Sequence, residues 1–136
     1  MTTTTKTTAR YLYAIGRRKT SIAKVRLYDD SKQSVSVNGK DLNAFFATAP
    51  LQKTVIDALT VGNAGTFRVE AVVSGGGVTG QAEAIRLGIA RAIITKTIEA
   101  RKDLKKAGFL KRDPRAKERR KFGLKKARKS PQWSKR

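Results

Sequence analysis

The chain has 136 residues and carries 31 lysines and arginines against 10 aspartates and glutamates, a formal net charge of +21 at neutral pH. A protein with this charge repels itself unless a polyanion neutralises it, so the composition favours a nucleic acid as partner. The chain contains no cysteine and no histidine, which excludes disulfides, thiolate zinc sites and an imidazole general base. The threonine-rich residues 1–10 lack the apolar core of a secretory signal, and no apolar run reaches about 18 residues, so we expect a cytoplasmic protein that does not span a membrane.

The charge is concentrated towards the C-terminus. Residues 1–100 carry 14 basic and 7 acidic side chains, a net charge of +7, whereas residues 101–136 carry 17 and 3, a net charge of +14. We therefore predict a disordered N-terminus over 1–9, a globular RNA-binding domain over 10–100 and a basic C-terminal extension over 101–136. Residues 101–107 can continue or restart a helix, with Gly108 as its cap. Beyond Asp113 the extension has too few large apolar residues to close a core, so we expect that this part becomes ordered only on a partner.

The first part of the globular region predicts two neighbouring strands. The short apolar run at 11–15 indicates a strand that is buried on both faces and ends at Gly16. The basic residues 17–19 then fall in a turn. Apolar residues interleaved with basic ones predict a second strand over 22–28.

The middle of the chain predicts a turn, two helices and two further strands. Valines alternate with serines over 34–37, and the Asn-Gly pair at 38–39 is a strong turn signal. A short helix follows over 41–47, with an aspartate at its first position as a candidate N-cap. Helical spacing of apolar residues over 51–59 predicts another helix, and alternation over 67–73 predicts a strand.

A long apolar helix completes the globular region. It follows the glycine-rich residues 75–80, and its apolar side is broad enough for a central position against the sheet. Its two apolar stripes are Ile85, Ile89 and Ile93, and Leu87, Ala90, Ile94 and Ile98. Strands and helices together predict an α+β fold, an α/β two-layer sandwich in which a small mixed sheet packs on helices.

The glycine run allows three interpretations. Gly75, Gly77 and Gly80 match the G-x-G-x-x-G pattern of dinucleotide-binding loops, and Glu99 lies 19 residues further on. The preceding short strands and hairpins do not suggest repeated parallel strand–helix units, and the lysine and hydroxyl of a phosphate loop are missing after Gly80. The glycines can instead permit positive φ angles and close helix–strand packing. The loop amides at the start of the helix could in addition meet an RNA phosphate.

Catalytic and metal sites find little support in the sequence. Among the acidic residues of the globular part only Asp29 and Asp30 are neighbours, and adjacent side chains in a turn seldom converge on one substrate atom. No other cluster of metal ligands accompanies them. We therefore expect no enzyme, no cofactor and no bound metal.

Three segments carry a resemblance to a known family. Residues 13–23, with the sequence YAIGRRKTSIA, residues 75–92, with the sequence GGGVTGQAEAIRLGIARA, and much of 107–136 occur in the order typical of that family. Over residues 10–136 the chain resembles small-subunit ribosomal protein S-nine, and its final Ser-Lys-Arg is similar to the bacterial and organellar type. The resemblance implies a fold like the second domain of ribosomal protein S-five.

The resemblance also implies partners and binding residues. The protein would lie in the head of the small subunit among neighbouring ribosomal proteins, bound to the large rRNA, with its extension reaching the peptidyl-site tRNA. The implied tRNA contacts are Ser134, Lys135 and Arg136, the last on phosphates of the anticodon loop. The implied rRNA contacts are the basic residues Arg17, Arg18, Lys19, Lys111, Arg112, Arg115, Arg119, Arg120, Lys121, Lys125, Lys126, Arg128 and Lys129.

Two positions depart from the family pattern. Trp133 stands where the family usually has phenylalanine or tyrosine, and Lys111 stands where a threonine is expected. On sequence alone Trp133 either stacks on a base or is an exposed aromatic with weak local packing.

Other classes of function remain open at this point. A general nucleic-acid chaperone or chromatin-like protein would bind unrelated RNA and DNA equally. A small enzyme that used the glycine loop would bind a nucleotide saturably even at high salt. A membrane-surface role is disfavoured because the extension lacks a helical apolar stripe.

Overall fold

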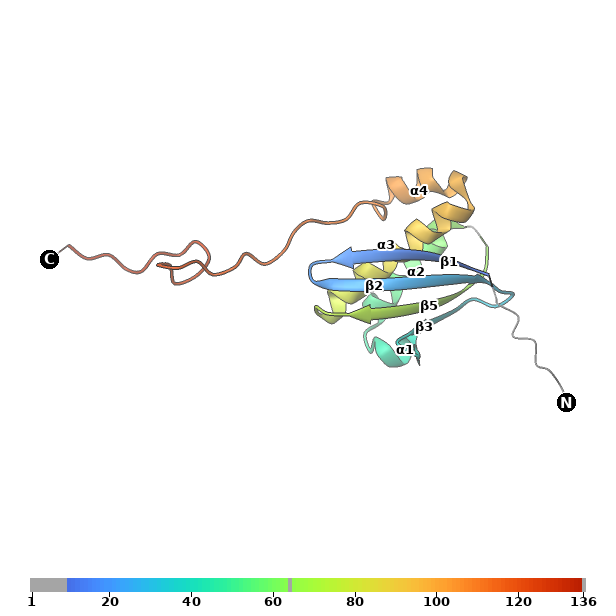
Figure 1. The fold of residues 1–136 in the computed structure, drawn as a ribbon, viewed down its shortest axis with the longest axis horizontal. Helices are drawn as coiled ribbons and strands as arrows, with labels where there is room; N and C mark the ends of the chain where they lie inside the picture. Colours follow the sequence, from blue (N-terminus) through green and yellow to red (C-terminus); the bar gives the residue numbers. More distant parts are fainter. Residues whose placement is uncertain (1–9, 64, 136) are drawn as a thin grey trace.

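The computed structural model describes residues 10–63 and 65–135, which form an α+β fold (Figure 1). The prediction of disorder over 1–9 lies outside these residues. The elements in chain order are β1 (Tyr11–Arg18), β2 (Ser21–Asp29), β3 (Ser34–Val37), β4 (Lys40–Asp41), α1 (Leu42–Phe45), α2 (Ala49–Gly62), β5 (Phe67–Ser74), α3 (Val78–Lys96), the 3-10 helix η1 (Ile98–Ala100) and α4 (Arg101–Lys106).

The strands form one mixed sheet in the order β1-β2-β5-β3-β4. The β1–β2, β2–β5 and β3–β4 pairs are antiparallel, whereas β3 and β5 are parallel. A parallel pair needs a crossover, and here β4, α1 and α2 provide it. The predicted mixed sheet packed on helices is confirmed.

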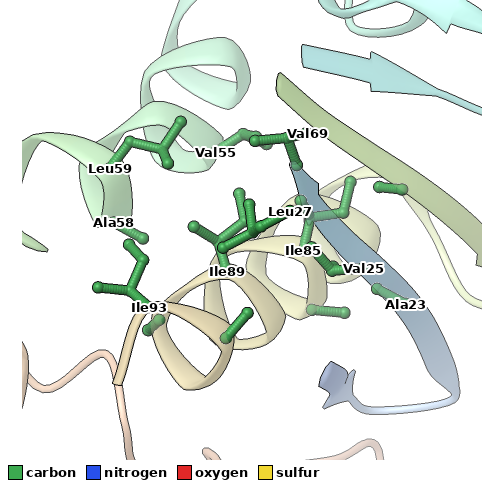
Figure 2. Packing of buried hydrophobic residues seen from close by; sticks show 14 of the residues in the cluster. Ala23, Val25, Leu27, Val55, Ala58, Leu59, Val69, Ile85, Ile89 and Ile93 are labelled. Atoms are coloured by element: carbon green, nitrogen blue, oxygen red, sulfur yellow. The ribbon is translucent and has the colours of Figure 1, made fainter. Parts of the chain in front are cut away.

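The core lies between one face of the sheet and the helices α2 and α3. Ile85 and Ile89 of α3 lie against Leu27 of β2, and Ile93 lies beside Ala58 of α2 (Figure 2). All five side chains are buried. The central position predicted for the long helix from its broad apolar side is therefore confirmed. The prediction is wrong for Ile98, because α3 ends at Lys96 and Ile98, in η1, is 76% exposed.

The prediction for the first strand is wrong in two respects. Tyr11 and Tyr13 are 47% and 48% exposed, because helices cover only the other face of β1. The strand also does not end at Gly16 but continues to Arg18, so that of the basic run only Lys19 lies in the turn, with a φ of 52°. Gly16 permits this continuation because its backbone lies against α3, where no side chain would fit.

Other predicted elements are confirmed with shifted ends. The Asn-Gly turn follows β3, and the side-chain amide of Asn38 fixes it by donating to the carbonyl of Val73 at 3.1 Å and accepting from its N–H at 2.9 Å. Asp41 precedes α1, but its side chain makes no capping hydrogen bond. Pro50 lies in the first turn of α2, where its missing N–H costs nothing. The long helix begins at Val78 and so includes part of the glycine run.

The C-terminal extension divides into a packed part and an open part. Leu104 of α4 is fully buried in the core, so the body reaches beyond the change in composition near residue 100. Gly108 ends α4 with a φ of 78°, and the Phe109 N–H returns to the Leu104 carbonyl at 3.0 Å. Residues 111–135, hereafter the tail, contain no helix or strand, and the greater part of the tail runs away from the body (Figure 1).

Candidate nucleic-acid interface

The tail is attached to the body through Arg18, whose residue is only 8% exposed. Its Nε donates to a carboxylate oxygen of Glu83 in α3, its Nη2 lies 3.1 Å from Oδ2 of Asp113, and its Nη1 donates to the carbonyl of Arg115 at 2.6 Å. A buried guanidinium requires partners for its donors, and here they come from the body and from the tail together. We call Arg18, Glu83, Asp113 and Arg115 the tail clamp, because they fix the point at which the tail leaves the body.

Asp113 stays ionised within the tail clamp. Its carboxylate accepts the side chain of Arg115, with Nη2 at 2.7 Å and Nε at 2.9 Å, and also the Arg115 backbone N–H at 2.9 Å. These side-chain and backbone hydrogen bonds, together with the charges of Arg115 and Arg18, hold the pKa of Asp113 well below its usual range. The same pairing raises the pKa of Arg115.

We expect the carboxyl of Asp113 to titrate well below its ordinary value of 3.8. Because the pKa is lowered in the folded chain, the ionised carboxylate stabilises the tail clamp above pH ~4, and this contribution is lost as the pH falls through the lowered pKa. Carbon-13 NMR of the carboxyl during an acid titration measures the midpoint. An Arg115→Ala variant should move the midpoint up towards 3.8, and an equal midpoint in both proteins would contradict the assigned cause.

A hollow of about 150 Å³ is lined on one side by the tail clamp, including the carboxylates of Glu83 and Asp113. The rest of its wall includes Arg17 of β1, Arg86 of α3, and Lys111 and Arg112 of the tail, so that cations outnumber carboxylates and we call it the basic hollow. Arg17, Lys111 and Arg112 are candidate rRNA contacts from widely separated sequence positions, and the fold brings them to one place. Cations gathered in a concave surface favour a phosphate more strongly than the same charges spread over a flat one.

Arg86 is not among the residues that the sequence predicts to bind RNA, because its helix is expected to form the core. Its guanidinium lies 4.6 Å from the ring centroid of Phe109, a cation–π contact that holds it at the hollow. Position 86 falls between the two apolar stripes of α3. A basic residue that interrupts the apolar pattern is the one sequence feature that could have indicated a surface role for Arg86.

The remaining predicted contacts lie along the open part of the tail. Lys121 and Arg128 share the carboxylate of Glu118, at 2.6 and 2.9 Å, and this draws the chain into a local loop. Exposed ion pairs of this kind contribute about 1 kcal/mol or less, so a phosphate can replace the carboxylate at little cost. Ser134 and Lys135 are exposed, and Arg136 lies outside the described residues. The other exposed tail cations with a predicted rRNA role are Arg119, Arg120, Lys125, Lys126 and Lys129.

Comparison with known proteins identifies the family. The family model described as ribosomal protein S9/S16 matches residues 16–136. The chain belongs to the ribosomal protein S9/S16 family. A protein of Cytophaga hutchinsonii named small ribosomal subunit protein uS9 is 52% identical over 126 residues, which cover 92% of this chain and 98% of the relative. Proteins of the same name from Salinispora arenicola and Thermosynechococcus vestitus are each 50% identical, over 93% and 89% of this chain and 82% and 89% of their own.

Membership of the S9/S16 family makes this chain a ribosomal protein and not an enzyme. The geometry of the glycine run agrees, since β5 pairs in parallel only with β3 and in antiparallel with β2, unlike the parallel sheet of a dinucleotide-binding domain. Gly75 and Gly76 have φ angles of 72° and 67°, and the carbonyl of Gly75 accepts the hydroxyl of Ser21 at 3.0 Å. The run is thus a tight turn that packs on the β1–β2 turn.

Two further findings concern the residues that the structure describes. Over 10–63 and 65–135, the aspartate and glutamate side chains form no group of three or more that could hold a metal ion. In the same ranges, every helix is too short or too polar to cross a membrane.

Proposed function

We propose that this S9/S16 family member is a structural constituent of the small ribosomal subunit in the cytoplasm. The observation that carries the proposal is its identity of about 50% to proteins named small ribosomal subunit protein uS9, over nearly the whole chain. Its net charge of +21 suits a component embedded in RNA. The body would adopt the fold that the family shares with the second domain of ribosomal protein S-five.

In this proposal the body is anchored on the large rRNA of the subunit head, beside neighbouring ribosomal proteins. Arg17, exposed on β1, belongs to the wall of the basic hollow, and Lys19, exposed in the following turn, lies beside Arg18 and Arg115 in a second, shallower hollow. Arg18 has a different part, because its donors are occupied by the tail clamp. It acts first as a positioning residue, and an rRNA phosphate would have to compete with two carboxylates for it.

The tail would follow rRNA inwards and end at the anticodon loop of the peptidyl-site tRNA. An extended segment can enter a path between RNA helices that no folded domain could enter, and its cations neutralise closely packed phosphates. Its tRNA contacts would be Ser134, Lys135 and Arg136. A guanidinium at that position offers a planar pair of donors to phosphate oxygens.

Sedimentation in a sucrose gradient at high salt tests the proposal. The endogenous protein should migrate with the small subunit in a fixed ratio, because many simultaneous contacts hold it where a merely electrostatic passenger would be stripped. A tightly held small-subunit protein serves as the internal standard. Release of the protein to the top of the gradient would contradict the proposal and favour a general nucleic-acid chaperone.

A further inference from the structure

One face of the sheet is left open by the helices. Along β1 and β2 the inward residues pack on α3, whereas every second residue points to the other side. The register places Tyr11, Tyr28 and Arg68 side by side across three strands. In the next row on the same face, two residues further along each strand, Tyr13 lies beside Arg26. We call the outward side of β1, β2 and β5 the open sheet face.

The open sheet face carries aromatic rings where a solvated sheet would be polar. The residues Tyr11 and Tyr13 are 47% and 48% exposed. The rings of Tyr11 and Tyr28 lie 5.5 Å apart between centroids at an interplanar angle of 51°, so they form a tilted aromatic pair. Beyond them Ile15 and Val72 are 36% and 56% exposed. Rings held on a rigid sheet lose little side-chain entropy when a base stacks on them.

Cations lie among these rings. The guanidinium of Arg26 is 5.4 Å from the ring centroid of Tyr11, and that of Arg68 is 4.6 Å from the centroid of Tyr28. Lys24 is exposed one row further along. Against these charges the face has the carboxylate of Glu70, which lies 3.8 Å from Arg68. The net charge of the face is therefore positive.

Aromatic rings interleaved with cations match the chemistry of unpaired RNA. Every base has a planar face that can stack on a ring, and each is flanked by phosphates that cations can contact. The open sheet face is also continuous with the basic hollow, because Arg17 points outward four residues after Tyr13 on β1, roughly 13 Å away at the rise of a strand. A second copy of this chain would be repelled by its charge of +21.

We propose that the open sheet face is a stacking platform for unpaired rRNA bases, with the ring of Tyr13 and the Tyr11–Tyr28 pair as the stacking surfaces and Arg26 and Arg68 on the flanking phosphates. This inference rests on the proposed function, since it takes rRNA as the partner. It adds a binding site on the side of the body that faces away from the helices.

Affinity for protein-free small-subunit rRNA tests the platform. A Tyr13→Thr variant keeps a residue that favours strands but removes the ring, and it should bind about tenfold more weakly while the salt dependence stays unchanged. A Tyr13→Phe variant keeps the ring and should bind like the unmodified protein. Ile98→Ala is the matched control, because Ile98 is a 76% exposed apolar residue outside the open sheet face.

A Tyr11→Thr/Tyr13→Thr double variant guards against compensation by the second ring and should lose more affinity than either change alone. Binding of the double variant at the level of the unmodified protein would overturn the platform but leave the proposed function intact. A loss that occurs only when other subunit proteins are present would also overturn it, and would assign the face to a protein neighbour. Failure of the unmodified protein itself to bind the rRNA would instead count against the proposed function.

Discussion

A Gly16→Ala variant should have a much less stable body. A Cβ atom at position 16 would lie 1.8 Å from the carbonyl oxygen of Ala84 and 2.6 Å from the backbone nitrogen of Gly88. Both are backbone atoms of α3, so no side-chain rotation can relieve the overlap. Overpacking within side chains typically costs about 1–3 kcal/mol, and displacing a strand from the central helix should cost at least the upper end of that range. The total stability of a domain of this size is about 5–15 kcal/mol, so much of it would be lost.

Gly77→Ala provides the matched control. A Cβ there meets nothing within 4 Å, and Gly77 has a φ of −101°, which alanine can adopt. Urea unfolding followed by circular dichroism should give a large drop in the free energy of unfolding for Gly16→Ala and a change of less than about 1 kcal/mol for Gly77→Ala. Equal stability of the two variants would mean that β1 can move away from α3 at no cost, and the close packing described above would then not be needed.

The pattern of apolar residues is sufficient to predict an element and its packing where apolar residues face the core and polar residues face solvent. The alternation in β2 and β5 and the broad apolar side of α3 report burial directly, and both the elements and their packing follow from it. The prediction for the first strand is wrong because it also equates apolar residues with burial. Tyr11 and Tyr13 are large and apolar enough to suggest a core position, but they lie on the open sheet face. Sequence alone does not distinguish a ring that is buried from one that is exposed on the open face of a sheet.

The tail clamp could not be predicted from the sequence. Arg18 stands in a run of three basic residues, which favours solvent or RNA, yet its partners lie 65 residues away at Glu83 and 97 residues away at Arg115. No local spacing reports such contacts. The physical reason is that the fold sets the last residue of β1 beside α3, and the exit of the chain from α4 then passes the same point. Prediction of the site therefore depended on knowing the topology first.

The tail clamp holds the first residues of the tail, whereas most of the charge of the tail lies beyond the clamp. A truncation can therefore remove this charge and leave the clamp in place. A chain that ends at Ala116 retains Asp113 and Arg115, so the clamp and the body should be unchanged. It loses residues 117–136, which carry ten lysines and arginines and one glutamate. Each phosphate contact contributes about 0.7–0.9 to the slope of log K against log salt concentration. We therefore expect the slope for rRNA binding to fall by about 5 or more, and the affinity to fall by about 10³ at moderate salt.

A chain that ends at Trp133 is the control for this truncation. It loses residues 134–136 alone, with two cations, so rRNA binding should change by only about one to two units of slope. If the tip contacts tRNA, this shorter truncation should also weaken retention of peptidyl-site tRNA on the subunit slightly, by about 1 kcal/mol or less. Filter binding over a salt series measures the first effect, and tRNA dissociation from purified subunits measures the second.

A chain ending at Ala116 that kept its rRNA affinity would place the main RNA contacts on the body, at the basic hollow and the open sheet face. Unchanged tRNA retention in the chain ending at Trp133 would remove the tip from the tRNA site.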